Sequence, residues 1–177
     1  LEQEPGDTAS RIKLLGYYFR QSYSNQNARD SKRKHVLWFI TTSPESEVLS
    51  SLYGMLDAIT DPEGYSKGKT AWKTNIEKDP QNLVYLRHSA EYFKMHDRAL
   101  AIESFQTARS LDADNPLWSE RLGHMYLLKM MTNSAKARSE AAMTVNTIDE
   151  HLDMLMAFKH FEAAYNLSTA MGQDSMI

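Results

Sequence analysis

The chain has 177 residues, of which 42% are hydrophobic and 24% are charged, and its formal net charge is −3. This composition is ordinary for a globular protein and argues against disorder, and the charge provides no overall attraction to nucleic acid or to an anionic membrane. The absence of cysteine excludes disulfides and thiolate metal sites but does not indicate a compartment.

The sequence contains no recognisable membrane-spanning or targeting segment. No apolar stretch approaches the roughly 18 residues that span a bilayer, and the first residues lack the pattern of a signal peptide. Because the chain begins with Leu1 and not with Met, we expect it to be a fragment or processed form of a longer protein. We expect a polar lead-in over residues 1–7 and a single helical domain over residues 8–177.

Apolar residues recur at spacings of three and four in the first half of the chain, which predicts helices. Thr8 or Ser10 is the expected cap of the first helix. Residues 43–45 and residues 60–63 each combine a capping residue, a proline and a glutamate, which is typical of helix starts. The four helices expected in this half cover residues 8–23, 28–42, 43–58 and 60–78.

The second half has the same helical periodicity. Met95-His96-Asp97 predicts a tight turn between the two helices of a hairpin, and Asn115-Pro116 starts the following helix. The helices expected here cover residues 81–95, 97–111, 116–129, 135–145 and 148–170. No segment alternates with period two for long enough to predict a strand, so the sequence predicts an all-α fold.

One pattern recurs after 34 residues. A small residue between two large ones, at residues 88–92 with Ala101, returns at residues 122–126 with Ala135. In addition, residues 101–108 contain alanine, phenylalanine and alanine at spacings of four and three. The period and these small residues resemble those of tetratricopeptide repeat (TPR) proteins, whose units are pairs of antiparallel helices.

The resemblance implies a right-handed superhelical array, in which large side chains fill the groove between one helix pair and the next. The best units cover residues 81–113 and 116–170. We expect an insertion at 130–150, because a second alanine–phenylalanine–alanine sequence begins only at Ala157. Residues 45–80 form a degenerate unit. The alternative is an irregular helical bundle in which these patterns occur by chance.

Several sequence patterns are candidate sites of chemistry. Residues 64–70 end like a phosphate-binding loop, but three residues separate the glycines where four are required, and the flanks are helical. We therefore interpret Lys67, Lys69 and Lys73 as the solvated face of a helix. The six histidines lack the spacing of a helical zinc pair, and no serine lies in a nucleophile elbow. We expect no metal, no cofactor and no catalysis.

The resemblance implies a non-catalytic scaffold that binds a protein or peptide along a concave surface of successive inner helices. The candidate contacts on those helices are Tyr85, Arg87, Lys94 and Arg121. The sequence does not identify the partner, and we expect neither nucleic acid nor membrane to be one. The alternative is a structural or oligomerisation domain that forms a homodimer through the apolar helix at 148–170.

One basic cluster stands beside Trp38. It consists of Arg29, Lys32, Arg33 and Lys34. Such a cluster is a candidate contact for an acidic peptide. The simpler interpretation, which we favour, is a solvated helix face whose opposite side is apolar.

Overall fold

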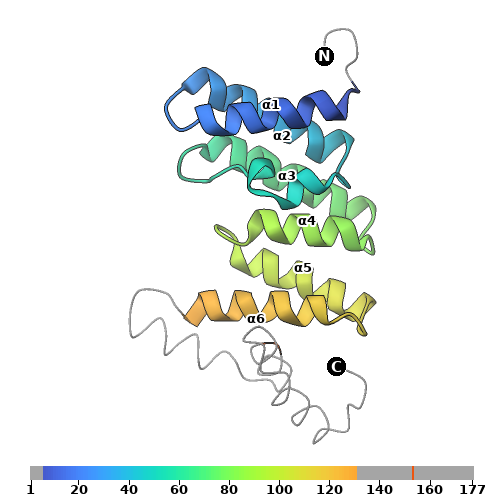
Figure 1. Ribbon diagram of the computed structural model, residues 1–177. Coiled ribbons are helices and arrows are strands. Elements are labelled where there is room, and N and C mark those ends of the chain that lie inside the picture. Colours follow the sequence, from blue (N-terminus) through green and yellow to red (C-terminus); the bar gives the residue numbers. More distant parts are fainter. Residues whose placement is uncertain (1–5, 131–152, 154–177) are drawn as a thin grey trace, which may run out of the picture. The chain divides into compact units, whose positions relative to one another are not determined.

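The computed structural model describes residues 6–130 and residue 153, and all regular elements among these residues are helical, which confirms the all-α class. The α-helices are α1 (Thr8–Gln21), α2 (Gln26–Thr42), α3 (Pro62–Lys78), α4 (Leu83–Phe93), α5 (Arg98–Leu111) and α6 (Pro116–Met130) (Figure 1). Two 3-10 helices, η1 (Glu47–Ser50) and η2 (Leu52–Gly54), lie between α2 and α3. Apart from Met130 and Asp153, the predicted insertion at 130–150 and the predicted helix at 148–170 lie outside the described residues.

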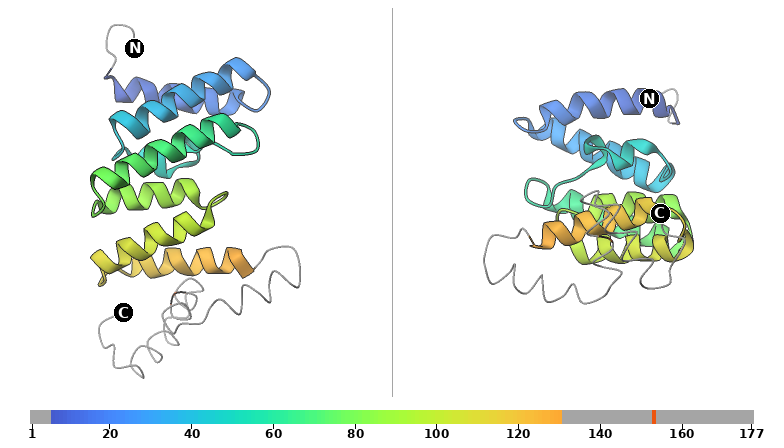
Figure 2. Two further views of the ribbon diagram at one scale, coloured as in Figure 1. Left: turned by 180° about the vertical axis from the view of Figure 1, so that it is seen from behind. Right: turned by 60° about the horizontal axis from the view of Figure 1, so that its bottom comes forward.

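The chain divides into two compact units, Leu1–Asp97 and Arg98–Ile177. In the first unit α1 packs on α2, α2 on α3 and α3 on α4, so that successive helices form layers (Figure 2). In the second unit α5 packs on α6. Short connections after α1 and α3 reverse the chain, as is typical of antiparallel helix pairs.

The residue before each helix of the first unit explains where that helix begins. The capping side chains, each of which accepts a hydrogen bond from a backbone N–H in the first turn, are Asp7, Asn25, Asp61 and Asn82. Asp7 accepts from the backbone N–H of Ser10 at 3.0 Å. The expectation that Thr8 or Ser10 caps α1 was therefore wrong, because the carboxylate one residue earlier takes that role.

The α-helix predicted over residues 43–58 is absent, and η1 and η2 occupy this segment instead. The hydroxyls of Ser50 and Ser51 donate to the carbonyl oxygens of Glu47 and Val48 at 2.9 and 2.6 Å. Such local hydrogen bonds compete with helix formation, which the start signal alone does not reveal. The segment contacts α4 through η1 and α1 through η2.

The core of the first unit lies between its layers. Its fully buried large side chains include Leu15, Phe39, Ile40, Leu49, Trp72, Leu86 and Tyr92. Two polar contacts fix α3 against α2. The Asn75 amide donates to the carbonyl oxygen of Ile40 at 2.7 Å, and the Arg33 guanidinium donates to both carboxylate oxygens of Asp61 at 2.9 and 2.5 Å.

A close contact between α3 and α4 depends on a glycine. The rings of Tyr65 and Tyr92 stack with centroids 5.2 Å apart, and Tyr92 Oη donates to the carbonyl oxygen of Tyr65 at 3.0 Å. A Cβ atom at Gly68 would lie 2.7 Å from Tyr92 Cζ. The packing of α3 on α4 thus explains Gly68, which belongs to the segment 64–70 that ends like a phosphate-binding loop. Nearby, Lys69 pairs with Asp97 at 2.9 Å, so it is not simply a solvated lysine.

The second unit has buried residues on both of its described helices. Ala101, Phe105 and Ala108 of α5 are buried, and so are Trp118 and Leu122 of α6. These small and large side chains therefore form the core of the second unit. Within the part of the chain that the structure describes, no helix is long and apolar enough to cross a membrane.

Candidate functional site

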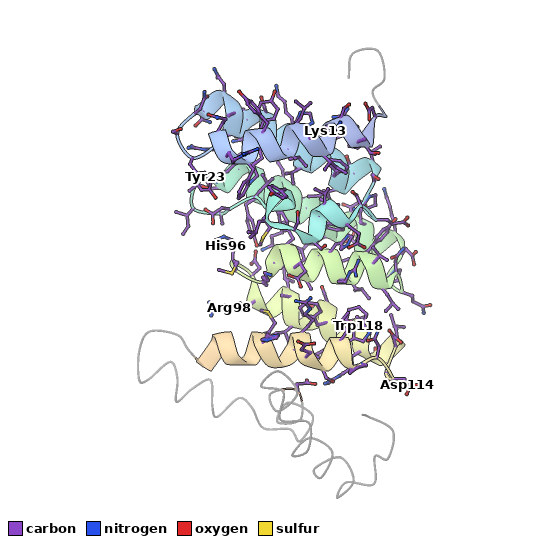
Figure 3. The ribbon with its side chains drawn as sticks, in the orientation of Figure 1. Lys13, Tyr23, His96, Arg98, Asp114 and Trp118 are labelled. Carbon is purple, nitrogen blue, oxygen red and sulfur yellow. The ribbon has the colours of Figure 1, made fainter. Side chains whose placement is uncertain are left out.

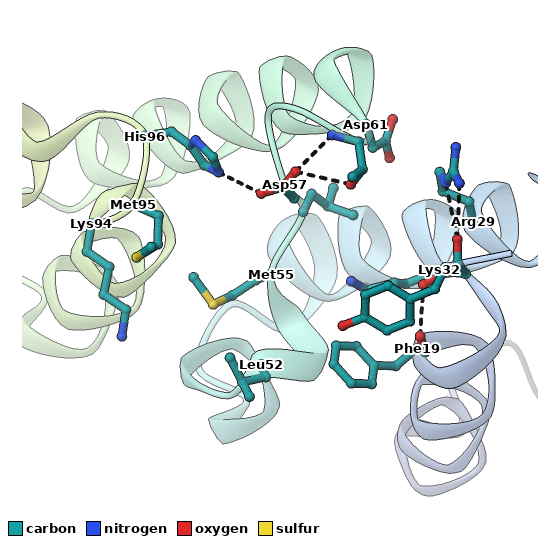
Figure 4. A pocket seen from close by; sticks show the side chains of 14 residues that line it. Phe19, Arg29, Lys32, Leu52, Met55, Asp57, Asp61, Lys94, Met95 and His96 are labelled. Carbon is teal, nitrogen blue, oxygen red and sulfur yellow. Dashed lines mark hydrogen bonds and ion pairs between the residues drawn. The ribbon is translucent and has the colours of Figure 1, made fainter. Parts of the chain in front are cut away.

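A pocket of about 500 Å³ opens at one edge of the first unit (Figure 4). Three regions line it: the end of α1 with the start of α2, the η2 helix with the loop that follows it, and the turn after α4. Tyr23, which follows α1, and His96, which follows α4, lie at the same edge of this unit (Figure 3).

The pocket exists because the segment between α2 and α3 is not an α-helix. The η1 and η2 helices contain only four and three residues, and the backbone is extended at Met55. A 3-10 segment of this length supplies less bulk than the longer α-helix predicted here. Consequently the space between the end of α1 and the turn after α4 is lined by isolated side chains and is not filled by a helix.

The rim of the pocket carries large apolar side chains that are exposed to solvent. Tyr23 is 74% exposed, Leu52 is 68% exposed and Met95 is 54% exposed, and all three line the pocket. Phe19 contributes its ring to the interior and packs edge-to-face on Tyr53, with centroids 5.1 Å apart. Exposed apolar groups that gather around a cavity are typical of a binding surface.

Asp57 organises the loop that forms one wall. Its carboxylate accepts from the backbone N–H groups of Ile59 and Thr60 at 3.0 and 2.8 Å, and it lies 3.0 Å from His96 Nε2. Burial raises the pKa of Asp57, but the hydrogen bonds from Thr60, His96 and Ile59 outweigh it and hold the pKa below its ordinary value. Asp57 is therefore an ionised and fully engaged carboxylate.

Arg29 is held at the junction of α1 and α2. Its guanidinium donates to the carbonyl oxygen of Ser22 at 3.3 and 3.2 Å and to the side chain of Gln26 at 3.0 Å. These contacts hold the arginine at the pocket wall, and both acceptors are uncharged, so they do not neutralise its charge.

Lys32 lies on the α2 side of the pocket and is half-buried. Its ammonium lies 5.1 Å from the centroid of the Phe19 ring, a cation–π arrangement. Burial lowers the pKa of Lys32, and the charges of Asp61 and Asp57 oppose this effect only in part. Among the described residues, Lys32 Nζ has neither an ion-pair partner nor a hydrogen-bond acceptor.

Of the three candidate partner contacts in the first unit, only Lys94 lines the pocket. Lys94 lines the pocket, where it pairs with Glu91 at 2.6 Å. Arg87 pairs with Glu47 of η1, and Tyr85 is half-buried on the same helix, outside the pocket lining. Arg121 is exposed on α6 of the second unit. Whether any of the four contacts a partner stays a prediction.

The basic cluster on α2 is more varied than a solvated face. Arg33 pairs with Asp61, whose side chain is 5% exposed, and Lys32 is half-buried in the pocket. Lys34 is exposed. The interpretation of the whole cluster as a solvated face was therefore wrong for Lys32 and Arg33. Helical periodicity cannot predict which of these side chains are exposed, because their exposure depends on α1, α3 and η1, which contact α2.

No family model matches this chain, and no curated protein or solved structure was found to match it. The pocket is therefore interpreted from its own chemistry. It combines an apolar interior, an apolar rim and cationic side chains. Among the residues that the structure describes, no three His, Asp or Glu side chains are grouped so that they could hold a metal ion.

Proposed function

We propose that this chain is a non-catalytic protein-binding module of TPR type, and that it binds a segment of a partner protein in the pocket of the first unit. The proposal rests chiefly on one observation: exposed Tyr23, Leu52 and Met95 surround a cavity large enough to receive side chains. Burying such side chains in a complex removes apolar surface from water, which favours association.

The layered helices support the TPR-type architecture as part of this proposal. Successive helices of the first unit pack on one another, and the small and large residues of the repeat signature in α5 and α6 are buried. A helical array of this kind presents side chains from several elements to one ligand. The pocket does so, because its lining comes from α1, α2, η2 and the turn after α4.

The expected partner segment is a peptide with large apolar side chains. Rim residues of the pocket are apolar and exposed, whereas Asp57 is engaged by its own loop and by His96. A groove of this chemistry recognises apolar anchors inserted into a pocket, as in helix-in-groove and extended-peptide recognition.

A bead-displayed library of random hexapeptides with blocked ends tests this function. We expect the wild-type chain to enrich peptides that contain large apolar residues, and Leu52→Asp to abolish this enrichment. Ile12→Asp is the matched control, because Ile12 is also an exposed apolar residue but does not line the pocket. Circular dichroism of each variant verifies that the helices are retained.

The outcomes separate the proposal from its alternatives. Loss of enrichment in both variants, or in neither, would show that the pocket is not the binding surface. A second copy of the chain is another possible occupant, and light scattering at several concentrations detects it. A doubled mass that Leu52→Asp returns to the monomer value would replace a peptide partner with self-association.

A further inference from the structure

Lys32 differs from every other charged side chain that lines the pocket. Arg29 donates to Ser22 and Gln26, and Lys94 pairs with Glu91. The carboxylates are engaged as well, because Asp61 pairs with Arg33 and Asp57 with His96. Lys32 Nζ, by contrast, makes no hydrogen bond or ion pair among the described residues; it lies 5.1 Å from the centroid of the Phe19 ring, and Asp57 and Asp61 act on it only through their charge.

A half-buried ammonium without an anion is unfavourable. Removal of water from a charge costs free energy unless a counter-charge or hydrogen-bond acceptors replace it. The Phe19 ring stabilises the cation only partly. Burial of Lys32 lowers its pKa, in accordance with this cost.

The surrounding charges determine which group the pocket accepts beside Lys32. Asp61 pairs with the cationic Arg33, and Asp57 accepts hydrogen bonds from the backbone N–H groups of Ile59 and Thr60, so neither carboxylate forms an ion pair with Lys32. Arg29 adds a positive charge whose hydrogen-bond acceptors are uncharged. A ligand anion placed next to Lys32 therefore meets net positive charge in a partly desolvated site, where charge-assisted hydrogen bonds are strong.

We propose that Lys32 selects the ligand of this pocket by binding a carboxylate, so that the recognised segment carries an aspartate or glutamate next to a large apolar side chain. This inference rests on the proposed function and specifies its partner. The apolar neighbour packs on Phe19, Met55 and Met95, while the carboxylate accepts hydrogen bonds from the Lys32 ammonium.

The same hexapeptide library tests the selectivity with a matched pair of variants. Lys32→Met keeps the aliphatic stem and removes the charge. Lys34→Met makes the identical change on the same helix, but Lys34 is exposed and does not line the pocket. Lys32→Arg keeps the charge and serves as the conservative variant. The affinity of one selected acidic peptide is then compared with that of its Asp→Asn or Glu→Gln counterpart.

We expect acidic residues to be enriched next to apolar ones with the wild-type chain, with Lys34→Met and with Lys32→Arg. Lys32→Met should lose the acidic preference and bind the selected acidic peptide about ten- to hundredfold more weakly. The neutral counterpart peptide should bind wild type and Lys32→Met with nearly equal affinity.

Three results would overturn the inference, and they differ in whether the proposed function still holds. If wild type enriches apolar peptides without acidic residues, the proposed function holds and the role of Lys32 is refuted. If no peptide is enriched at all, the proposed function fails and the inference fails with it. An equal loss of acidic preference in Lys32→Met and Lys34→Met would also refute it, since general attraction by α2 would then suffice.

Discussion

Replacing Gly68 with alanine tests how closely α3 approaches α4. The new Cβ atom would lie 2.7 Å from Tyr92 Cζ, well inside ordinary van der Waals contact. Tyr92 is fully buried and stacked on Tyr65, so its ring has little room to move. Overpacking of this kind costs about 1–3 kcal/mol. If the ring shifts, the hydrogen bond to the Tyr65 carbonyl is lost, at a further cost of about 1 kcal/mol.

Gly16 provides the matched control for this substitution. It also lies inside a helix, but a Cβ atom there would meet nothing within 4 Å. Alanine favours a helix interior over glycine by about 1 kcal/mol, which partly offsets the clash at residue 68. We therefore expect Gly16→Ala to stabilise the chain slightly and Gly68→Ala to destabilise it by about 1–3 kcal/mol.

Urea unfolding followed by far-ultraviolet circular dichroism measures both changes, provided that the slope of unfolding free energy against urea is the same in each variant. Tyr92→Phe adds a further check, because removal of the hydroxyl should reduce the cost of Gly68→Ala. Equal stabilisation by both alanines would refute the described packing of α3 on α4.

Two further predictions concern buried charge. Burial lowers the pKa of His88, whose Nδ1 lies 3.0 Å from the carbonyl oxygen of Pro44. The imidazole of His88 therefore binds a proton more readily in the unfolded chain than in the folded chain. The unfolding free energy should decrease as pH falls from about 7.5 to 5.5, by up to about 1.4 kcal/mol per pH unit. Denaturant titrations at several pH values should show a weaker dependence of the unfolding free energy on pH for His88→Asn. Asp61→Ala removes both the partner of Arg33 and the cap of α3, and should lower the unfolding free energy by about 3–5 kcal/mol. Thermal and denaturant unfolding should show a much smaller effect for Glu63→Ala, because Glu63 is an exposed partner of the same arginine; equal effects would contradict the buried pairing.

The features that the sequence predicted well are local ones. The cap–proline–glutamate sequence at residues 60–63 predicted the start of α3, and Asp61 caps that helix as the signal implies. Helix starts depend on neighbouring residues along the chain, so periodicity and capping identify them. The same signal failed at residues 43–45, because serine side chains and packing against α1 and α4 favour 3-10 turns there.

The pocket could not be predicted, because no local pattern encodes it. Phe19 belongs to α1, Lys32 to α2, Met55 to the loop after η2 and His96 to the turn after α4. Lys32 and Lys34 are two residues apart and chemically identical, yet Lys32 is half-buried and Lys34 is exposed. Only the neighbours that α2 meets in the folded chain distinguish them. In addition, the sequence predicted an α-helix over residues 43–58, whereas the short 3-10 helices that leave space for the pocket lie there.

The discontinuous lining of the pocket has a practical consequence for the search for a ligand. Short fragments of the chain cannot reproduce the pocket, so deletion mapping would report loss of binding for nearly every truncation within the first unit. Conversely, any ligand that binds there links α1, α2, η2 and the turn after α4, and stabilises the folded unit by mass action. A rise in melting temperature, measured on the intact chain against a panel of compounds, would therefore detect occupancy before any partner is identified.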